Sequence, residues 1–121
     1  MKTILLVDDE YAVVEILATL LADEGYAVLT ASDGQQALEI LSERIPDAVI
    51  TDLMMPLVDG VELFREMQRN ASHRRIPVLL MSSAPIAPPN SKLPWAMFLQ
   101  KPFNFHELVV WLGKHLEARA K

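Results

Sequence analysis

Three aspartates are the residues whose types and spacing most clearly allow chemistry. Asp8 and Asp9 directly follow the apolar run 4–7, and Asp52 directly follows the apolar run 48–51. Like charges that share a site raise one another's pKa unless a cation offsets them, and carboxylate oxygens suit Mg²⁺ or Mn²⁺. If the two runs end at the same place in the fold, they predict a divalent metal site in which Asp52 is a candidate nucleophile.

Hydroxyl and ammonium groups follow two later apolar runs. Ser82 and Ser83 come after the run 78–81, and Lys101 closes the segment that contains the run 97–99. A lysine and a hydroxyl beside a metal are complementary to a phosphoryl group, because they neutralise and hydrogen-bond its oxygens. Each group alone is commonplace, since strand-end serines usually bond to backbone. Of the two serines, Ser82 is the better candidate.

The elements that must position these groups are strands buried on both faces. Runs of four or five apolar residues without alternation are typical of parallel strands covered by helices on each side. Strands that alternate with amphipathic stretches predict a doubly wound α/β fold, with ligands at the carboxyl ends of the strands. In the five-strand order 2-1-3-4-5, strands one and three are neighbours, so the three acids converge. The candidate strands are 4–7, 27–30, 48–51, 78–81 and 97–99.

Helices are predicted between most of these strands. Their starts carry capping residues and their ends carry glycine or proline. The first ends at about Glu24 before Gly25, the second begins at Ser32 or Asp33 and stops before Pro46, the third runs from near Asp59 to about Asn70, and the last opens at Asn104 with Glu107 at capping-box spacing.

One interval breaks the alternation. Four prolines fall between Pro85 and Pro94, where a fourth helix is expected between the last two strands. Proline removes a backbone donor and clashes with the preceding turn. We therefore expect that helix to be short, irregular or absent.

Composition excludes several classes of protein. A chain of 121 residues with 51% hydrophobic and 22% charged residues fits one globular domain over 1–121. A net charge of -5 argues against a direct nucleic-acid partner, and the absence of cysteine excludes disulfides and thiol chemistry. Acids interrupt the first apolar run too early for a signal peptide or a membrane span, so we expect a cytoplasmic protein.

Together, three motifs resemble the response-regulator receiver family. They are LLVDDE at 5–10, TDLMMP at 51–56 with Asp59-Gly60 following, and KPF at 101–103. Each is weak alone, but they occur in the right order at the right strand ends and cover nearly the whole chain. The resemblance implies a flavodoxin-like sheet and a Lys101–Pro102 bond that is commonly cis.

The resemblance also implies a role for each matching residue. Ser82 and Phe98 are implied as switch residues, and Ser83 as the adjacent small residue. Met54 has a side chain that cannot hydrogen-bond strongly to an attacking water. The phosphoacceptor is Asp52, the phosphate-binding groups are Lys101 and Ser82, and the Mg²⁺ or Mn²⁺ ligands are Asp8, Asp9, Asp52 and the backbone carbonyl of Met54.

The implied function is signalling rather than catalysis on a separate substrate. A histidine kinase or phosphotransfer protein would phosphorylate Asp52, and the domain would then change its contacts with a downstream protein, with homodimer formation left open. The alternative is a pseudo-receiver that binds a partner without phosphorylation. A phosphatase of the haloacid-dehalogenase type would need Asp-x-Asp where the chain has Asp8-Asp9. Because the sequence shows no second domain after Lys121, we expect the chain either to act alone or to be a receiver cut from a longer protein.

The three histidines are not candidate phosphodonors. His73, His106 and His115 lie far from the acids in the predicted topology and lack ligand spacing. We expect all three at the surface.

Overall fold

The computed structural model describes residues 1–55, 57–82, 96–101 and 104–120. Strands and helices alternate along the chain, as the apolar runs predict. The elements are β1 (Thr3–Val7), α1 (Tyr11–Asp23), β2 (Ala27–Ala31), α2 (Gly34–Glu43), β3 (Ala48–Asp52), α3 (Gly60–Arg69), β4 (Val78–Ser82), β5 (Ala96–Gln100) and α4 (Phe105–Ala120).

All five strands form one parallel sheet in the order β2-β1-β3-β4-β5, which confirms the predicted topology. The strands are paired up to their carboxyl ends, which therefore lie side by side. Val7 is opposite Thr51, Asp52 is opposite Met81, and Ser82 is opposite Gln100. Consequently the residues that follow β1, β3, β4 and β5 meet at one edge of the sheet.

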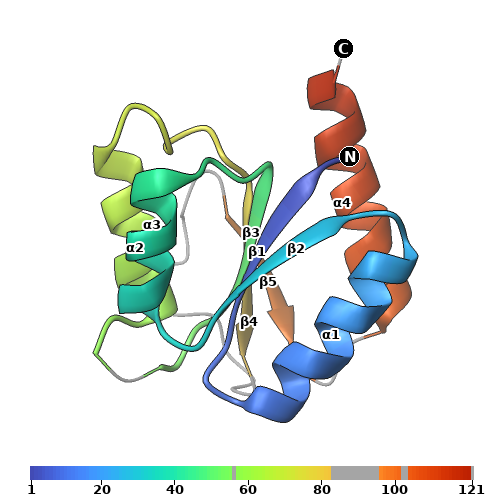
Figure 1. Ribbon diagram of the computed structural model, residues 1–121, viewed down its shortest axis with the longest axis horizontal. Coiled ribbons are helices and arrows are strands. Elements are labelled where there is room, and N and C mark those ends of the chain that lie inside the picture. Colours follow the sequence, from blue (N-terminus) through green and yellow to red (C-terminus); the bar gives the residue numbers. More distant parts are fainter. Residues whose placement is uncertain (56, 83–95, 102–103, 121) are drawn as a thin grey trace.

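Helices cover both faces of the sheet, with α2 and α3 on one face and α1 and α4 on the other (Figure 1). Alternate residues of β1 serve the two layers, because Leu5 points into the α2/α3 core and Leu6 into the α1/α4 core. This burial on both faces is why the strand sequences lack a polar alternation. The site therefore stands on a sheet fixed from both sides.

Most helix ends follow the sequence signals. Gly25 has a positive φ of 95° after α1, and the Asp33 and Asp59 side chains accept hydrogen bonds from the third backbone N–H beyond them, capping α2 and α3. At α4, however, the Asn104 side chain accepts from the N–H of His106 rather than Glu107. The predicted capping box thus has a different hydrogen bond.

The surface prediction for His73 is wrong. His73 is only 7% exposed, and its Nε2 lies 3.0 Å from the carbonyl oxygen of Leu41 in the last turn of α2. Carbonyls in the last turn of a helix lack partners within the helix. His73 therefore belongs to the packing between α2 and the loop before β4, while His106 and His115 are exposed as expected.

Some predictions lie outside the described residues. These are the proline-rich interval, Ser83, the Lys101–Pro102 bond and the side chain of Phe98. In the described part of the chain, no helix has the length and apolar character needed to cross a membrane.

Candidate metal and phosphoryl site

The three predicted acids meet at the carboxyl edge of the sheet. One carboxylate oxygen from each of Asp8, Asp9 and Asp52 lies within 4.8 Å of the others. Asp8 and Asp52 are 1% and 7% exposed, whereas Asp9 is open to solvent. Two buried carboxylates beside an exposed one form a cluster of oxygen ligands that a cation could reach from outside.

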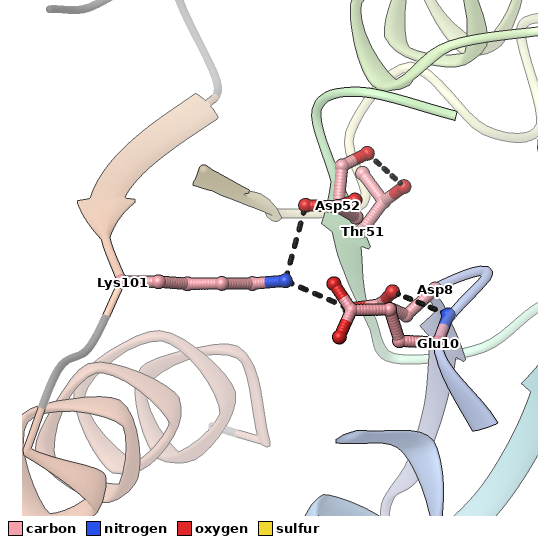
Figure 2. A network of polar contacts seen from close by, with 5 residues as sticks. All are labelled: Asp8, Glu10, Thr51, Asp52 and Lys101. Atoms are coloured by element: carbon pink, nitrogen blue, oxygen red, sulfur yellow. Dashed lines mark hydrogen bonds and ion pairs between the residues drawn. The ribbon is translucent and has the colours of Figure 1, made fainter. Parts of the chain in front are cut away.

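Lys101 follows β5, the strand at one end of the sheet order, and its side chain reaches the acids. Its Nζ lies 3.1 Å from Asp8 Oδ2 and 3.3 Å from Asp52 Oδ1, and Figure 2 shows the extended side chain ending between the two carboxylates. The backbone N–H of Lys101 donates to the carbonyl of Ser82 at 2.6 Å. This bond fixes the start of the lysine side chain relative to β4.

The electrostatics of Asp52 reflect its crowded surroundings. Burial raises the pKa of Asp52, the charge of Asp8 raises it further, and Lys101 only partly offsets both. For Lys101, burial alone would lower the pKa, but the hydrogen bond to Asp8 and the charges of Asp8 and Asp52 outweigh it and raise the pKa. One ammonium therefore does not fully compensate the acids.

Asp8 is held by a local contact that the sequence reading missed. Its Oδ1 accepts a hydrogen bond of 2.9 Å from the N–H of Glu10, the residue before α1, so the carboxylate presents Oδ2 to Lys101 (Figure 2). An aspartate that accepts from the N–H two residues ahead is a common turn pattern. That spacing was visible in the sequence and could have predicted the orientation.

Two further candidates from the sequence, Ser82 and Met54, lie in segments next to the acids. Ser82 ends β4, is 1% exposed, and follows the residue that pairs with Asp52. Met54 lies in the loop after β3, with its residue 69% exposed, and Leu57 in the same loop has a positive φ of 67° and is 82% exposed. The loop beside Asp52 thus presents apolar side chains to solvent.

A cavity of about 190 Å³ opens beside the acid pair, which the sequence did not predict. Its walls come from the start of α1, the end of β2 and the start of α2. The lining residues include Asp8, Asp9, Tyr11, Thr30, Ser32 and Gln36.

Comparison with known proteins identifies the family. Residues 4–112 match the response regulator receiver domain. The phosphate regulon transcriptional regulatory protein PhoB of Pseudomonas aeruginosa is 34% identical over 116 residues, covering 92% of this chain and 50% of that protein. The chain spans 31% to 50% of the length of the first curated relatives it matches.

Solved structures agree with this match. Chemotaxis protein CheY4 of Vibrio cholerae has a TM-score of 0.85 at 29% identity, covering 96% of this chain and 99% of that one. The receiver domain of a sensor histidine kinase from Pseudomonas aeruginosa PAO1, solved with magnesium in its active-site cleft, has a TM-score of 0.84 at 27% identity, covering 96% and 98%. The family match and the shared fold together make this chain a member of the response regulator receiver domain family, which serves two-component signalling.

Proposed function

We propose that the chain accepts a phosphoryl group on Asp52 from a histidine kinase or a phosphotransfer protein, in a reaction that requires Mg²⁺ or Mn²⁺. The observation that carries this proposal is the placement of the Lys101 ammonium within 3.3 Å of Asp52 Oδ1 and 3.1 Å of Asp8 Oδ2. A cation held between a nucleophilic carboxylate and a metal-ligand carboxylate is well placed to bind an oxygen of the incoming phosphoryl group.

In the proposed transfer, a carboxylate oxygen of Asp52 attacks the phosphorus of a phosphohistidine. The new P–O bond forms as the P–N bond breaks, and the electron pair of that bond leaves with the imidazole nitrogen. Lys101 turns from the carboxylates toward the phosphoryl oxygens, and Ser82 at the end of β4 donates its hydroxyl to them. Asp8 stays oriented because Glu10 holds its other oxygen.

The donor set fits a hard divalent cation. Three carboxylates face one ammonium, which leaves two negative charges uncompensated when all three acids are ionised. Asp8, Asp9, Asp52 and the backbone carbonyl of Met54 would hold the ion, with water completing its shell. When bound, Mg²⁺ would neutralise charge on the phosphoryl oxygens as they approach Asp52. The magnesium seen in a receiver domain of the same fold supports this assignment.

The consequence of phosphorylation is a change in protein contacts. Ser82 and Phe98 are the proposed switch residues, since they lie on the neighbouring strands β4 and β5 beside the site. A response of this kind makes 1–121 a receiver domain that promotes its own phosphorylation and dephosphorylation and acts on no separate substrate. Its partners are a cytoplasmic phosphodonor and a downstream protein.

Beryllofluoride, which mimics an acyl phosphate, tests this function. Fluorine NMR should detect one bound species that requires Mg²⁺ and disappears in Asp52→Ala. Asp47→Asn is the matched control, because Asp47 is an aspartate at the opposite edge of the sheet, where it accepts from the N–H of Thr3. Binding retained in Asp52→Ala would remove Asp52 from its role.

The same mimic, used in a second experiment, separates phosphorylation control from a pseudo-receiver. A pulldown of partner proteins with and without beryllofluoride should give different captured proteins. An identical set of partners in both conditions, together with no bound beryllofluoride, would favour the pseudo-receiver.

A further inference from the structure

Gly34, the first residue of α2, lies against the backbone of the loop that follows β3. A Cβ added to Gly34 would lie 2.3 Å from the carbonyl oxygen of Val58 and 2.7 Å from its Cβ and Cγ1. These separations are far below van der Waals contact. Position 34 therefore requires glycine because a side chain would not fit there. A positive φ is not the reason, because among the glycines of the described residues the positive φ is at Gly25.

The loop that Gly34 contacts is fixed at both of its ends. Leu53 donates its N–H to Met81 at 2.7 Å and accepts from the N–H of Gly60 at 2.9 Å. Gly60 is itself tight, because a Cβ there would lie 2.5 Å from the carbonyl oxygen of Asp52. Val58 and Met54 both lie between these two anchors, Leu53 and Gly60.

The residues that lead into α2 are also linked to the acid pair. The N–H of Asp8 donates to the carbonyl of Ala31 at 3.2 Å, which ties the end of β2 to the acid pair. Ser32 and Gln36, joined by a hydrogen bond of 2.9 Å, line the cavity next to Asp8 and Asp9. The beginning of α2 therefore connects the acid pair on one side with the loop after β3 on the other.

We propose that Gly34 is a positioning residue for the metal site. Because Gly34 has no side chain, the start of α2 can pack directly against Val58. This packing would keep the loop that carries the Met54 carbonyl in place beside the carboxylates. This inference rests on the proposed function, because it concerns the cation that Asp8, Asp9 and Asp52 bind. It assigns a role to a residue that contributes no ligand.

Two other glycines provide matched controls for a Gly→Ala substitution. Gly25→Ala places a side chain in open space at a φ of +95°, so it strains the backbone without touching the loop. Gly113→Ala also meets open space, in the middle of α4, where alanine favours the helix. The three variants separate a general loss of stability from a displaced ligand.

Calorimetric titration with Mg²⁺ and NMR of the metal-free protein are the two measurements. Gly34→Ala should weaken Mg²⁺ binding about tenfold, the lower end of the effect of residues that orient metal ligands. Its backbone N–H signals at Leu53, Met54 and Met55 should shift before metal is added. Gly25→Ala and Gly113→Ala should bind Mg²⁺ within about twofold of wild type.

A second variant keeps the inference falsifiable if Gly34→Ala folds poorly. Val58→Gly removes two of the three atoms in the way and frees the carbonyl to turn aside. The double variant Gly34→Ala/Val58→Gly should therefore fold and bind Mg²⁺ as Val58→Gly does. A tenfold loss that persists in the Val58→Gly background would overturn the proposed contact.

The outcomes distinguish this inference from the proposed function. If wild type binds Mg²⁺ and folded Gly34→Ala binds it equally well, the positioning role is wrong and the proposed function stands. If wild type itself binds no Mg²⁺, the proposed function fails and takes the inference with it.

Discussion

The two edges of the parallel sheet both contain buried or half-buried polar side chains, but their contacts differ. At the amino edge, Asp47 accepts from the N–H of Thr3 and His73 contacts the carbonyl of Leu41. At the carboxyl edge, charged side chains meet one another, with Lys101 between two carboxylates. Burial of a polar residue is therefore a poor sign of chemistry in this fold. Convergence of charges from separate strands is the better sign.

Among the substitutions that test this difference between the two edges, Asp8→Asn should have the largest effect on Mg²⁺ binding. The amide keeps the oxygen that accepts from Glu10 but loses a charged ligand, so Mg²⁺ affinity should fall about 100-fold. Calorimetric titration measures the change. Asp47→Asn at the amino edge should leave the affinity within about twofold. Equal losses in the two variants would break the distinction between the edges.

His73→Ala tests the amino edge in the opposite sense. It removes the contact with the Leu41 carbonyl and leaves a buried gap, so the free energy of unfolding should fall by about 2–3 kcal/mol. Urea denaturation gives this value. Mg²⁺ affinity of the folded variant should be unchanged, and a clear loss would show that the two edges are coupled.

Lys101→Met removes the ammonium while keeping much of the side chain. The carboxylates lose their only compensating cation in the described residues, so Mg²⁺ should bind more tightly, by up to about tenfold. Beryllofluoride should bind less tightly, because its fluorines lose the lysine. Parallel changes of both affinities would contradict the proposed division between metal ligands and the phosphoryl-binding lysine.

The smallest expected effect is on the pH dependence of stability without metal. Because burial and Asp8 raise the pKa of Asp52 above its ordinary value of 3.8, the native state holds its proton more strongly than the unfolded chain. The contribution of Asp52 is full below pH 3.8 and is lost as pH rises through the raised pKa. Thermal melts should show a steeper decline over that window in wild type than in Asp52→Asn.

Much of the fold followed from local patterns. The apolar runs predicted the strands to within a residue or two, because strands buried on both faces need continuous hydrophobic sequence. The convergence of Asp8 and Asp52 then followed from topology, since parallel strands end at a common edge. Lys101 was placed by the same argument.

Other features depend on contacts that spacing does not reveal. His73 is buried because its ring meets a helix-end carbonyl 32 residues away in the sequence. The need for glycine at position 34 arises from Val58, which is 24 residues away in the sequence and lies against it because α2 and α3 pack on the same face of the sheet. Local sequence could identify these residues as a histidine and a helix-start glycine but could not supply their partners.

The central claim is that the phosphoryl group is carried by Asp52. The direct test uses phosphoramidate, whose P–N bond resembles that of phosphohistidine, followed by borohydride reduction of the acyl phosphate and mass spectrometry of peptides. With Mg²⁺, we predict one modified residue, Asp52, and no modification in Asp52→Asn or without the metal. Modification of a different residue, or an equal yield in Asp52→Asn, would contradict the account.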